Sequence, residues 1–289
     1  MANSSAGRSS LSRAMDLLAA FDLDAVFLSV SQLSARSGLP LTTTHRLVAE
    51  LVQLGLLERQ PDRTYRLGVR LWELASKTPG AVGLREIAQP HLLAVHSRVR
   101  QHAQLGVLDG RDVLFLERLS TREAVVNFTV IGGRLPLHAS SSGQVLLAHS
   151  PTAFQEEILA SELVAYTHNT VHRPADLRSL LDGIRHDGFA VADGFLHESA
   201  RGIAVPVRGV NNDVVAAMSV VVPNNDSSPM PHVRLLLAAA AAASKDLLAA
   251  YSPGSEDVAG GAFRVLMRSS EQSMAVFPGM PRAVSRPRP

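Results

Sequence analysis

The feature that most constrains the fold is residues 29–54, where two helix patterns are separated by only a few residues. Ser29, with Gln32 three positions later, forms a capping box that marks the start of a helix. Gly38 is a typical residue just after a helix end. A second helix follows over about residues 41–54, with apolar side chains at helical spacing. Because an amphipathic helix also precedes this pair, the pattern predicts a helix-turn-helix built on three short helices.

A β-hairpin after the second helix completes a winged form of the motif. Residues 56–59 and 64–67 have the composition of short strands around a Pro-Asp turn. The second helix of such a motif lies in the major groove of DNA. The pattern alone is equally compatible with three helices packed as an ordinary small domain. If DNA binds, we expect contacts from polar and basic side chains near this helix and on the wing: Arg36, Thr42, Thr43, Thr44, His45, Arg46, Arg63 and Arg66.

The longer second part of the chain mixes helix and strand patterns without strict alternation. Such a mixture is typical of an α+β domain, with helices on one or both faces of a sheet. The expected helices cover residues 84–100, 142–149, 175–186 and 233–251, and the expected strands cover 104–108, 112–119, 125–130, 189–192, 202–207 and 214–222.

The predicted elements divide the chain into four regions. Residues 8–70 form the winged domain, 71–83 a linker and 84–251 the α+β domain. Residues 252–289 are rich in Pro, Gly, Ser and Arg, a composition that buries too little apolar surface to order itself. We therefore expect a disordered tail there.

Composition excludes several classes of protein. The chain has no cysteine, so it forms no disulfide and no thiolate metal site. Its longest apolar run, residues 235–243, is much shorter than the ~20 residues of a membrane-spanning helix. The polar N-terminus has no apolar signal core. We therefore expect a cytoplasmic protein with no membrane partner. The net charge is only +2, so a basic surface for DNA must be local.

A run of small polar residues, 139–143, leads into a predicted helix. Free backbone N–H groups at a helix start, beside serine hydroxyls, bind an anion without a lysine. The candidate effector ligands are therefore Ser140, Ser141, Ser142 and Gly143. The alternative is that the run is only a capped turn. We interpret the adjacent His138 as a structural or pocket-wall residue, because a lone histidine is more often structural than a ligand contact.

Signatures of catalysis and metal binding are missing from the sequence. It contains no Gly-x-Ser-x-Gly elbow, no P-loop and no Gly-x-Gly-x-x-Gly. The pair His197-Glu198 lacks the spacing of a zinc-binding helix. We therefore predict no catalytic residue, no metal and no cofactor. A hydrolase that uses the serine run with His138 stays open as an alternative, since sequence does not show their distance in space.

Six segments, in consistent order between Leu11 and Tyr251, match the pattern of one protein family. They are 38–47 (GLPLTTTHRL), 65–68 (YRLG), 84–90 (LREIAQP), 133–140 (GRLPLHAS), 203–207 (IAVPV) and 215–220 (VAAMSV). Together they resemble the IclR family of bacterial transcriptional regulators. The resemblance implies a winged helix-turn-helix, a linker helix and a GAF-like effector-binding domain. It also implies a dimer, or a dimer of dimers, on a palindromic operator of double-stranded DNA.

The resemblance further implies a function and three more site residues. Members of the family regulate catabolic genes and respond to small organic acids, often aromatic ones. Asp193, Gly202 and Ser219 correspond to positions that line the family's effector cavity. Gly202 stands where many members have Cys, and we interpret it as opening space for a bulkier ligand. Gln144 replaces a usual Lys, which removes a cation near the cavity.

The function that follows is a ligand-responsive repressor of catabolic genes rather than an enzyme. Its effector would be a small organic acid or acyl derivative, and we expect an aromatic one. A GAF-type sensor module that acts through protein contacts, with a degenerate DNA-binding domain, is the alternative.

Overall fold

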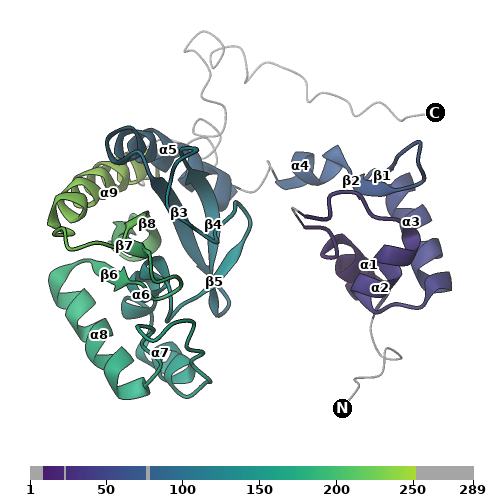
Figure 1. Ribbon diagram of the computed structural model, residues 1–289. Helices are drawn as coiled ribbons and strands as arrows, with labels where there is room; N and C mark the ends of the chain where they lie inside the picture. The colour runs from purple at the N-terminus through teal and green to yellow at the C-terminus, as the bar shows by residue number, and fades with distance from the viewer. Residues whose placement is uncertain (1–8, 23, 76–78, 252–289) are drawn as a thin grey trace, which may run out of the picture. The chain divides into compact units, whose positions relative to one another are not determined.

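The computed structural model describes residues 9–22, 24–75 and 79–251, which fall into two units (Figure 1). The first unit ends at Thr78 and the second begins at Pro79. The expected tail, 252–289, lies outside the described residues, as do residues 76–78 of the expected linker.

The first unit is a winged helix-turn-helix, as predicted. The capping box of the second helix is formed: Ser29 Oγ accepts from Gln32 N, and Gln32 Oε1 accepts from Ser29 N. That helix ends at Gly38, whose φ of 68° is in the left-handed region that favours glycine. The elements are α1 Ser10–Leu18, α2 Val30–Ser37, α3 Leu41–Gln53, β1 Leu57–Arg59, β2 Tyr65–Leu67 and α4 Val69–Ala75, with β1 and β2 antiparallel.

One apolar core joins the three helices and the hairpin. Each element contributes from a single face, through buried leucines such as Leu17 of α1, Leu33 of α2, Leu47 of α3 and Leu57 of β1. Burial of one such side chain is worth about 1.5–3 kcal/mol. Because α3 uses only its inner face for this core, its outer face is free for another role.

The second unit is built on a six-stranded sheet in which every neighbouring pair is antiparallel. The strand order is β5-β4-β3-β8-β7-β6. Strands β3 and β8, far apart in the sequence, are neighbours at its centre. The strands are β3 His102–Asp109, β4 Asp112–Leu119, β5 Arg134–Pro136, β6 Ala190–Asp193, β7 Ala200–Arg208 and β8 Val214–Pro223.

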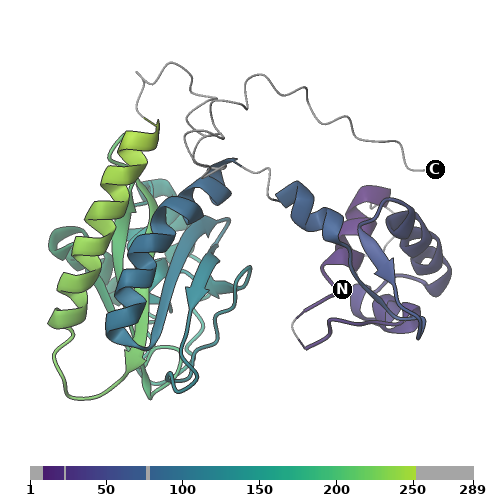
Figure 2. The same ribbon diagram turned by 90° about the horizontal axis from the view of Figure 1, so that it is seen from above.

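Helices cover both faces of this sheet. Helices α5 Pro79–Val99 and α9 Met230–Tyr251 lie side by side on one face (Figure 2). On the other face lie α6 Ser141–Ala148, α7 Thr152–Leu159 and α8 Pro174–Asp187. Each face has its own apolar core. The predicted α+β, GAF-like architecture is therefore confirmed.

Small residues beneath α6 bring that helix close to the sheet. Along β7, Ile203 and Val205 face α5 and α9, while Gly202 and Ala204 face α6, as expected from the two-residue period of a strand. Every residue of α6 is buried. The small residues thus allow the N-terminus of α6 to lie directly against the strands.

The start of one helix differs from the prediction, and two elements were not expected. Helix α5 begins at Pro79 instead of Leu84, so part of the expected linker is helical. Helix α7 and strand β5 were not predicted at all.

The strand predicted over residues 125–130 is wrong. Residues 121–131, called the strap below, contain neither helix nor strand. Side chains of the β3 region hold the strap in place of a backbone ladder. Val125 N donates to Gln101 Oε1 (2.8 Å), and the Val125 carbonyl accepts from His102 Nε2 (2.6 Å). The β-branched composition of the strap reflects partial burial, since Val126 and Thr129 line a pocket.

His102 is held as a neutral imidazole. Burial lowers the pKa of His102, and the nearby Arg118 cation acts in the same direction, against the effect of the Val125 hydrogen bond. The proton on Nε2 is donated to Val125, while Nδ1 lies 3.4 Å from Arg118 Nη2. The tautomer therefore suits both neighbours, and the strap stays anchored at this point.

Candidate functional site

The exposed face of α3 is the first candidate site. Thr42, His45 and Arg46 are exposed and Thr43 is partly exposed. These side chains lie on the first two turns, opposite the buried stripe that includes Leu47. Pro40 precedes the helix and supplies no side-chain cap. The first backbone N–H groups of α3 therefore remain able to bind a phosphate.

Thr44 corrects one of the predicted DNA contacts. It is completely buried, and its hydroxyl donates to the Pro40 carbonyl at 3.1 Å. A threonine in this position closes the first turn of α3 from inside and does not reach a base.

The predicted arginines of this unit differ in how strongly they are held. Arg36 pairs with Asp22, and Arg46 lies 3.5 Å from Glu50 one turn away. Exposed pairs of this kind contribute little to stability, so both side chains can exchange a carboxylate for a phosphate at small cost.

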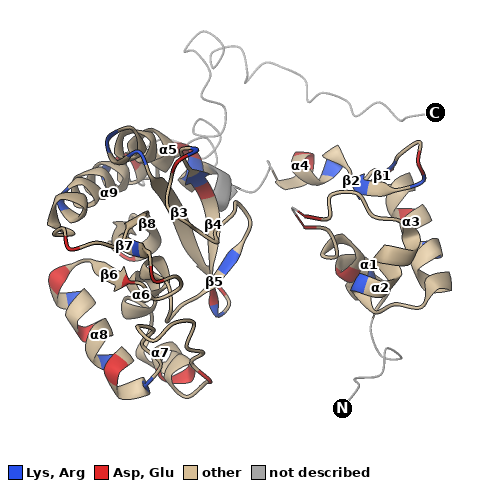
Figure 3. Cartoon of the chain, viewed as in Figure 1, with Lys and Arg blue, Asp and Glu red and all other residues tan. Residues whose placement is uncertain are grey.

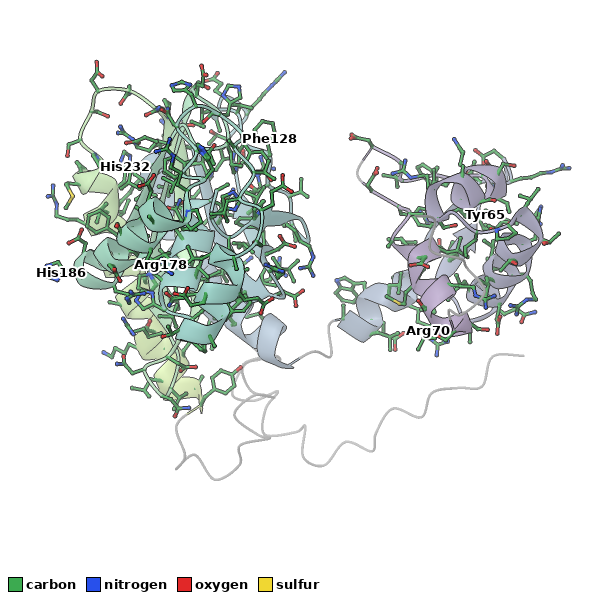
Figure 4. All side chains as sticks on the ribbon, turned by 90° about the horizontal axis from the view of Figure 1, so that it is seen from below. Tyr65, Arg70, Phe128, Arg178, His186 and His232 are labelled. Carbon is green, nitrogen blue, oxygen red and sulfur yellow. The ribbon has the colours of Figure 1, made fainter. Side chains whose placement is uncertain are left out.

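The wing brings basic and acidic side chains together (Figure 3). Arg66 donates to Glu58 across the hairpin at 2.9 and 2.6 Å, and these bonds lower the pKa of the Glu58 carboxyl. Arg63, at the turn with φ 68°, is exposed and has no side-chain hydrogen bond to any described residue. Arg70, labelled in Figure 4, instead donates to the Leu54 carbonyl after α3 (2.8 Å). Arg63 is thus the wing arginine most available for DNA.

The second candidate site is a pocket between α6, the sheet and the strap. It contains about 470 Å³ of empty space, part of it continuous with solvent. The described lining residues include no Lys, Arg, Asp or Glu. They are Gln104, Phe115, Val126, Asn127, Phe128, Thr129, Leu135, Ala139, Ser140, Ser141, Ser142, Ala192, Phe195, Leu196, His197, Ala200, Gly202 and Val221.

The N-terminus of α6 presents hydrogen-bond donors at this pocket. Ser140 is its N-cap: the hydroxyl accepts from Gly143 N (3.2 Å) and donates to the Pro136 carbonyl (3.1 Å). The backbone N–H groups of Ser141 and Ser142 have no partner among the described residues. Two unpaired donors at a helix N-terminus, in a neutral apolar pocket, favour an anion or another acceptor.

A buried chain of hydrogen bonds fixes the polar side of the pocket. Ser142 Oγ donates to Ser219 Oγ (2.9 Å), and Ser219 Oγ lies 3.5 Å from Gln104 Oε1. Gln104 Nε2 in turn donates to Thr129 Oγ1 of the strap. Ser219 therefore does not line the pocket as expected. It lies one hydrogen bond behind Ser142 and orients that side chain.

Gly202 lies directly against a serine of α6. A Cβ atom placed on Gly202 would lie 2.8 Å from Ser141 Oγ. The missing side chain therefore makes room for the Ser141 hydroxyl. Both residues line the pocket.

Three further predicted residues are not found at the pocket wall. His138 hydrogen-bonds through Nε2 to the Val164 carbonyl (2.9 Å). Gly143 packs on the backbone of Leu137, where a side chain would collide. Asp193 pairs with Arg201. The expectations for Gly143 and Asp193 are therefore corrected, whereas the hydrogen bond of His138 agrees with the structural role expected for it.

Sequence reasoning missed the pocket residues contributed by loops. Asn127 and Phe128 belong to the strap, and Phe195 and His197 to a second loop. The rings of Phe128 (Figure 4) and His197 lie 6.1 Å apart at 52°, so the two loops meet over the pocket. The apolar residues at 126 and 128 were the only available signal, and they were interpreted as a strand.

No group of three or more His, Asp or Glu side chains among the described residues is arranged to hold a metal ion. In the same part of the chain, no helix is long and apolar enough to cross a membrane.

Known protein families match almost the whole described chain. A model described as the IclR helix-turn-helix domain matches residues 10–61. A model described as the bacterial transcriptional regulator IclR C-terminal domain matches residues 77–246.

Individual relatives agree with these models. The Pca regulon regulatory protein of Pseudomonas putida is 30% identical over 73% of this chain and 73% of its own length. The HTH-type transcriptional regulator XynR of Escherichia coli is 31% identical over 73% of this chain and 84% of its own. A crystal structure of an IclR homolog from Microbacterium hydrocarbonoxydans, complexed with 4-hydroxybenzoate, is 44% identical. It covers 83% of this chain and 100% of its own, with a TM-score of 0.80.

Proposed function

Because this chain belongs to the IclR family of bacterial transcriptional regulators, we propose that it represses catabolic genes until a small aromatic acid occupies the pocket beside α6. We further propose that it reads a palindromic operator as a dimer or a dimer of dimers. The observation that carries the effector class is the neutral pocket, in which unpaired N–H donors of α6 adjoin aromatic side chains.

The chemistry of the pocket suits a carboxylate attached to a ring. The N–H groups of Ser141 and Ser142 and the Ser141 hydroxyl supply neutral donors for the carboxylate. Phe115 and Leu135 supply an apolar wall for the ring. The similar protein from Microbacterium hydrocarbonoxydans was crystallised with 4-hydroxybenzoate, and this acid has both groups.

A titration with 4-hydroxybenzoate tests the proposal. We expect the acid to weaken binding to the DNA upstream of the chain's own gene by about 5- to 150-fold, the usual range of allosteric coupling. Gel shift and calorimetry on the same preparation measure the DNA and effector affinities. Tighter DNA binding with the acid would contradict repression relieved by effector. No detectable binding of any aromatic acid would contradict the effector class.

The dimer is proposed to form through exposed apolar side chains of α1 and α4. Trp72 and Val69 of α4 are each 71% exposed, and Leu11 of α1 is 74% exposed. Large apolar groups left in solvent favour burial against another protein surface. A reader of a palindrome needs a second copy held at a fixed spacing, so we assign these exposed side chains to contacts with a second copy of the chain.

Replacing Trp72 with lysine should dissociate the dimer. A buried aromatic residue contributes strongly to an interface, and a lysine in its place adds a charge without repelling DNA. Light scattering at micromolar concentration should then give the monomer mass of 30.9 kDa. The control is Phe27→Lys, which alters an exposed aromatic residue of the same unit outside both helices. An unchanged oligomer in Trp72→Lys would show that α4 is not the contact.

A further inference from the structure

We propose that Asn127 of the strap reads a second acceptor oxygen on the effector, separate from the carboxylate held at α6. This inference rests on the function proposed above and narrows the class of effector. Asn127 would favour aromatic acids that carry a hydroxyl or other oxygen substituent over the unsubstituted aromatic acid.

The orientation of the Asn127 amide is fixed by the strap itself. Asn127 Oδ1 accepts a hydrogen bond from Thr129 N at 3.1 Å. Since a backbone N–H can only donate, the side-chain atom that faces it must be the oxygen. The NH2 group therefore occupies the other position. Asn127 lines the pocket, and this Nδ2 is buried with no partner among the described residues.

An unpaired buried donor is unfavourable, and no described residue accepts a hydrogen bond from Asn127 Nδ2. Buried polar groups are nearly always hydrogen-bonded. Nearby Gln104 is already engaged through both amide atoms, with Thr129 and Ser219. The Ser140 hydroxyl is likewise used twice, by Gly143 N and the Pro136 carbonyl. The partner of Asn127 Nδ2 must therefore come from whatever fills the pocket.

Two sets of donors reach the pocket from different elements. Ser141 and Ser142 have unpaired N–H groups at the start of α6, Asn127 of the strap has an unpaired and buried Nδ2, and all three residues line the pocket. No Lys or Arg is among the described lining residues, so each acceptor of the ligand must be met by a neutral donor. A carboxylate can accept hydrogen bonds from the N–H groups at the start of α6. A second oxygen on the ring can accept a hydrogen bond from Asn127 Nδ2, which points to the hydroxybenzoate class.

Two substitutions distinguish the loss of the Asn127 NH2 donor from a disturbance of the turn that Asn127 caps. Asn127→Asp keeps an oxygen for Thr129 N but replaces the NH2 group with a second oxygen. Asn127→Ala removes the donor without adding charge. The control is Asn225→Asp, because Asn225 Oδ1 accepts from Ser227 N at 3.1 Å in the same kind of turn and does not line the pocket. Melting curves establish that each variant is folded.

Calorimetry with benzoate, 3-hydroxybenzoate and 4-hydroxybenzoate measures the effect. The wild type should bind the better hydroxy acid about tenfold more tightly than benzoate, the worth of one hydrogen bond. In Asn127→Ala that preference should fall to about one. In Asn127→Asp the binding of benzoate and of both hydroxybenzoates should weaken, because the new carboxylate repels the carboxylate of each acid. The preference for the hydroxy acid should also be lost. Asn225→Asp should match the wild type.

The outcomes distinguish this inference from the function on which it rests. If the wild type binds none of the acids, the proposed function fails and the inference fails with it. If the wild type binds them and Asn127→Ala keeps the preference for the hydroxy acid, only the inference is overturned. An equal loss for benzoate and the hydroxy acids in Asn127→Ala would place Asn127 on the carboxylate, which also overturns it.

Discussion

Replacing Thr43, His45 and Arg46 together with alanine is expected to abolish specific DNA binding. All three side chains lie on the outer face of α3 near its N-terminus, and none belongs to the apolar core. A direct contact to a base edge is worth about 1–3 kcal/mol, so the loss of two or three contacts should weaken operator binding at least about thirtyfold. Gel shift with the DNA upstream of the chain's own gene measures this change.

The single substitution Arg46→Ala gives a finer test of the same surface. If Arg46 contacts a phosphate, the slope of log K against log salt should fall by about 1. The matched control is a triple alanine variant at Thr152, His186 and Arg122, which removes the same residue types from exposed positions of the second unit. Full DNA affinity in the α3 variant, with a native melting temperature, would overturn the assignment of α3 as the recognition helix.

The first unit was predictable because its signals are local. The capping box at Ser29 and Gln32 and the glycine at 38 act within a few residues, so their geometry follows from the sequence. Thr44 shows the limit of this reasoning. Its spacing places it between exposed neighbours, but it faces the core and bonds to Pro40. The prediction placed Thr44 on the outer face because it is polar and lies near a helix start, but its side chain is buried.

The pocket was only partly predictable because its wall is assembled from distant segments. The serine run before α6 has a local signature, and Ser140 caps the helix as that signature requires. Gln104 and Ser219 come from two strands that are 115 residues apart and meet at 3.5 Å only after the sheet has formed. No local pattern reveals this contact.

The strap shows how one composition supports two structures. Alternating apolar and polar residues over 125–130 satisfy the pattern of a half-buried strand. The strap is half-buried, but its partners are the side chains of Gln101, His102 and Gln104 rather than a neighbouring strand. The apolar side chains of the pattern are not the most buried ones, since Val126 and Phe128 are 39% and 57% exposed, whereas the polar Thr129 is only 3% exposed. The contact between Gly202 and Ser141 could likewise not be identified from sequence, because the two residues belong to different elements.

Because Gly202 lies beside Ser141, a large side chain at position 202 should have a strong effect on effector binding. Any side chain at 202 must enter the space between β7 and the start of α6, where a Cβ already lies 2.8 Å from Ser141 Oγ. Alanine can be accommodated by rotation of the serine hydroxyl, so Gly202→Ala should reduce effector affinity only modestly. Leucine is too large for this adjustment. It must project into the pocket that Ser141, Ser142 and Gly202 line.

Gly202→Leu should therefore reduce effector binding by more than about a hundredfold, the loss of two or more hydrogen bonds and part of the ring contact, and should leave DNA binding unresponsive to 4-hydroxybenzoate. Overpacking costs about 1–3 kcal/mol of stability, so melting curves must accompany the calorimetry. DNA affinity without effector should persist, because α3 belongs to the other unit. Gly183→Leu, at a helical position with no atom near its Cβ, is the matched control. Unchanged affinity for the acid in a folded Gly202→Leu protein would show that the effector binds elsewhere.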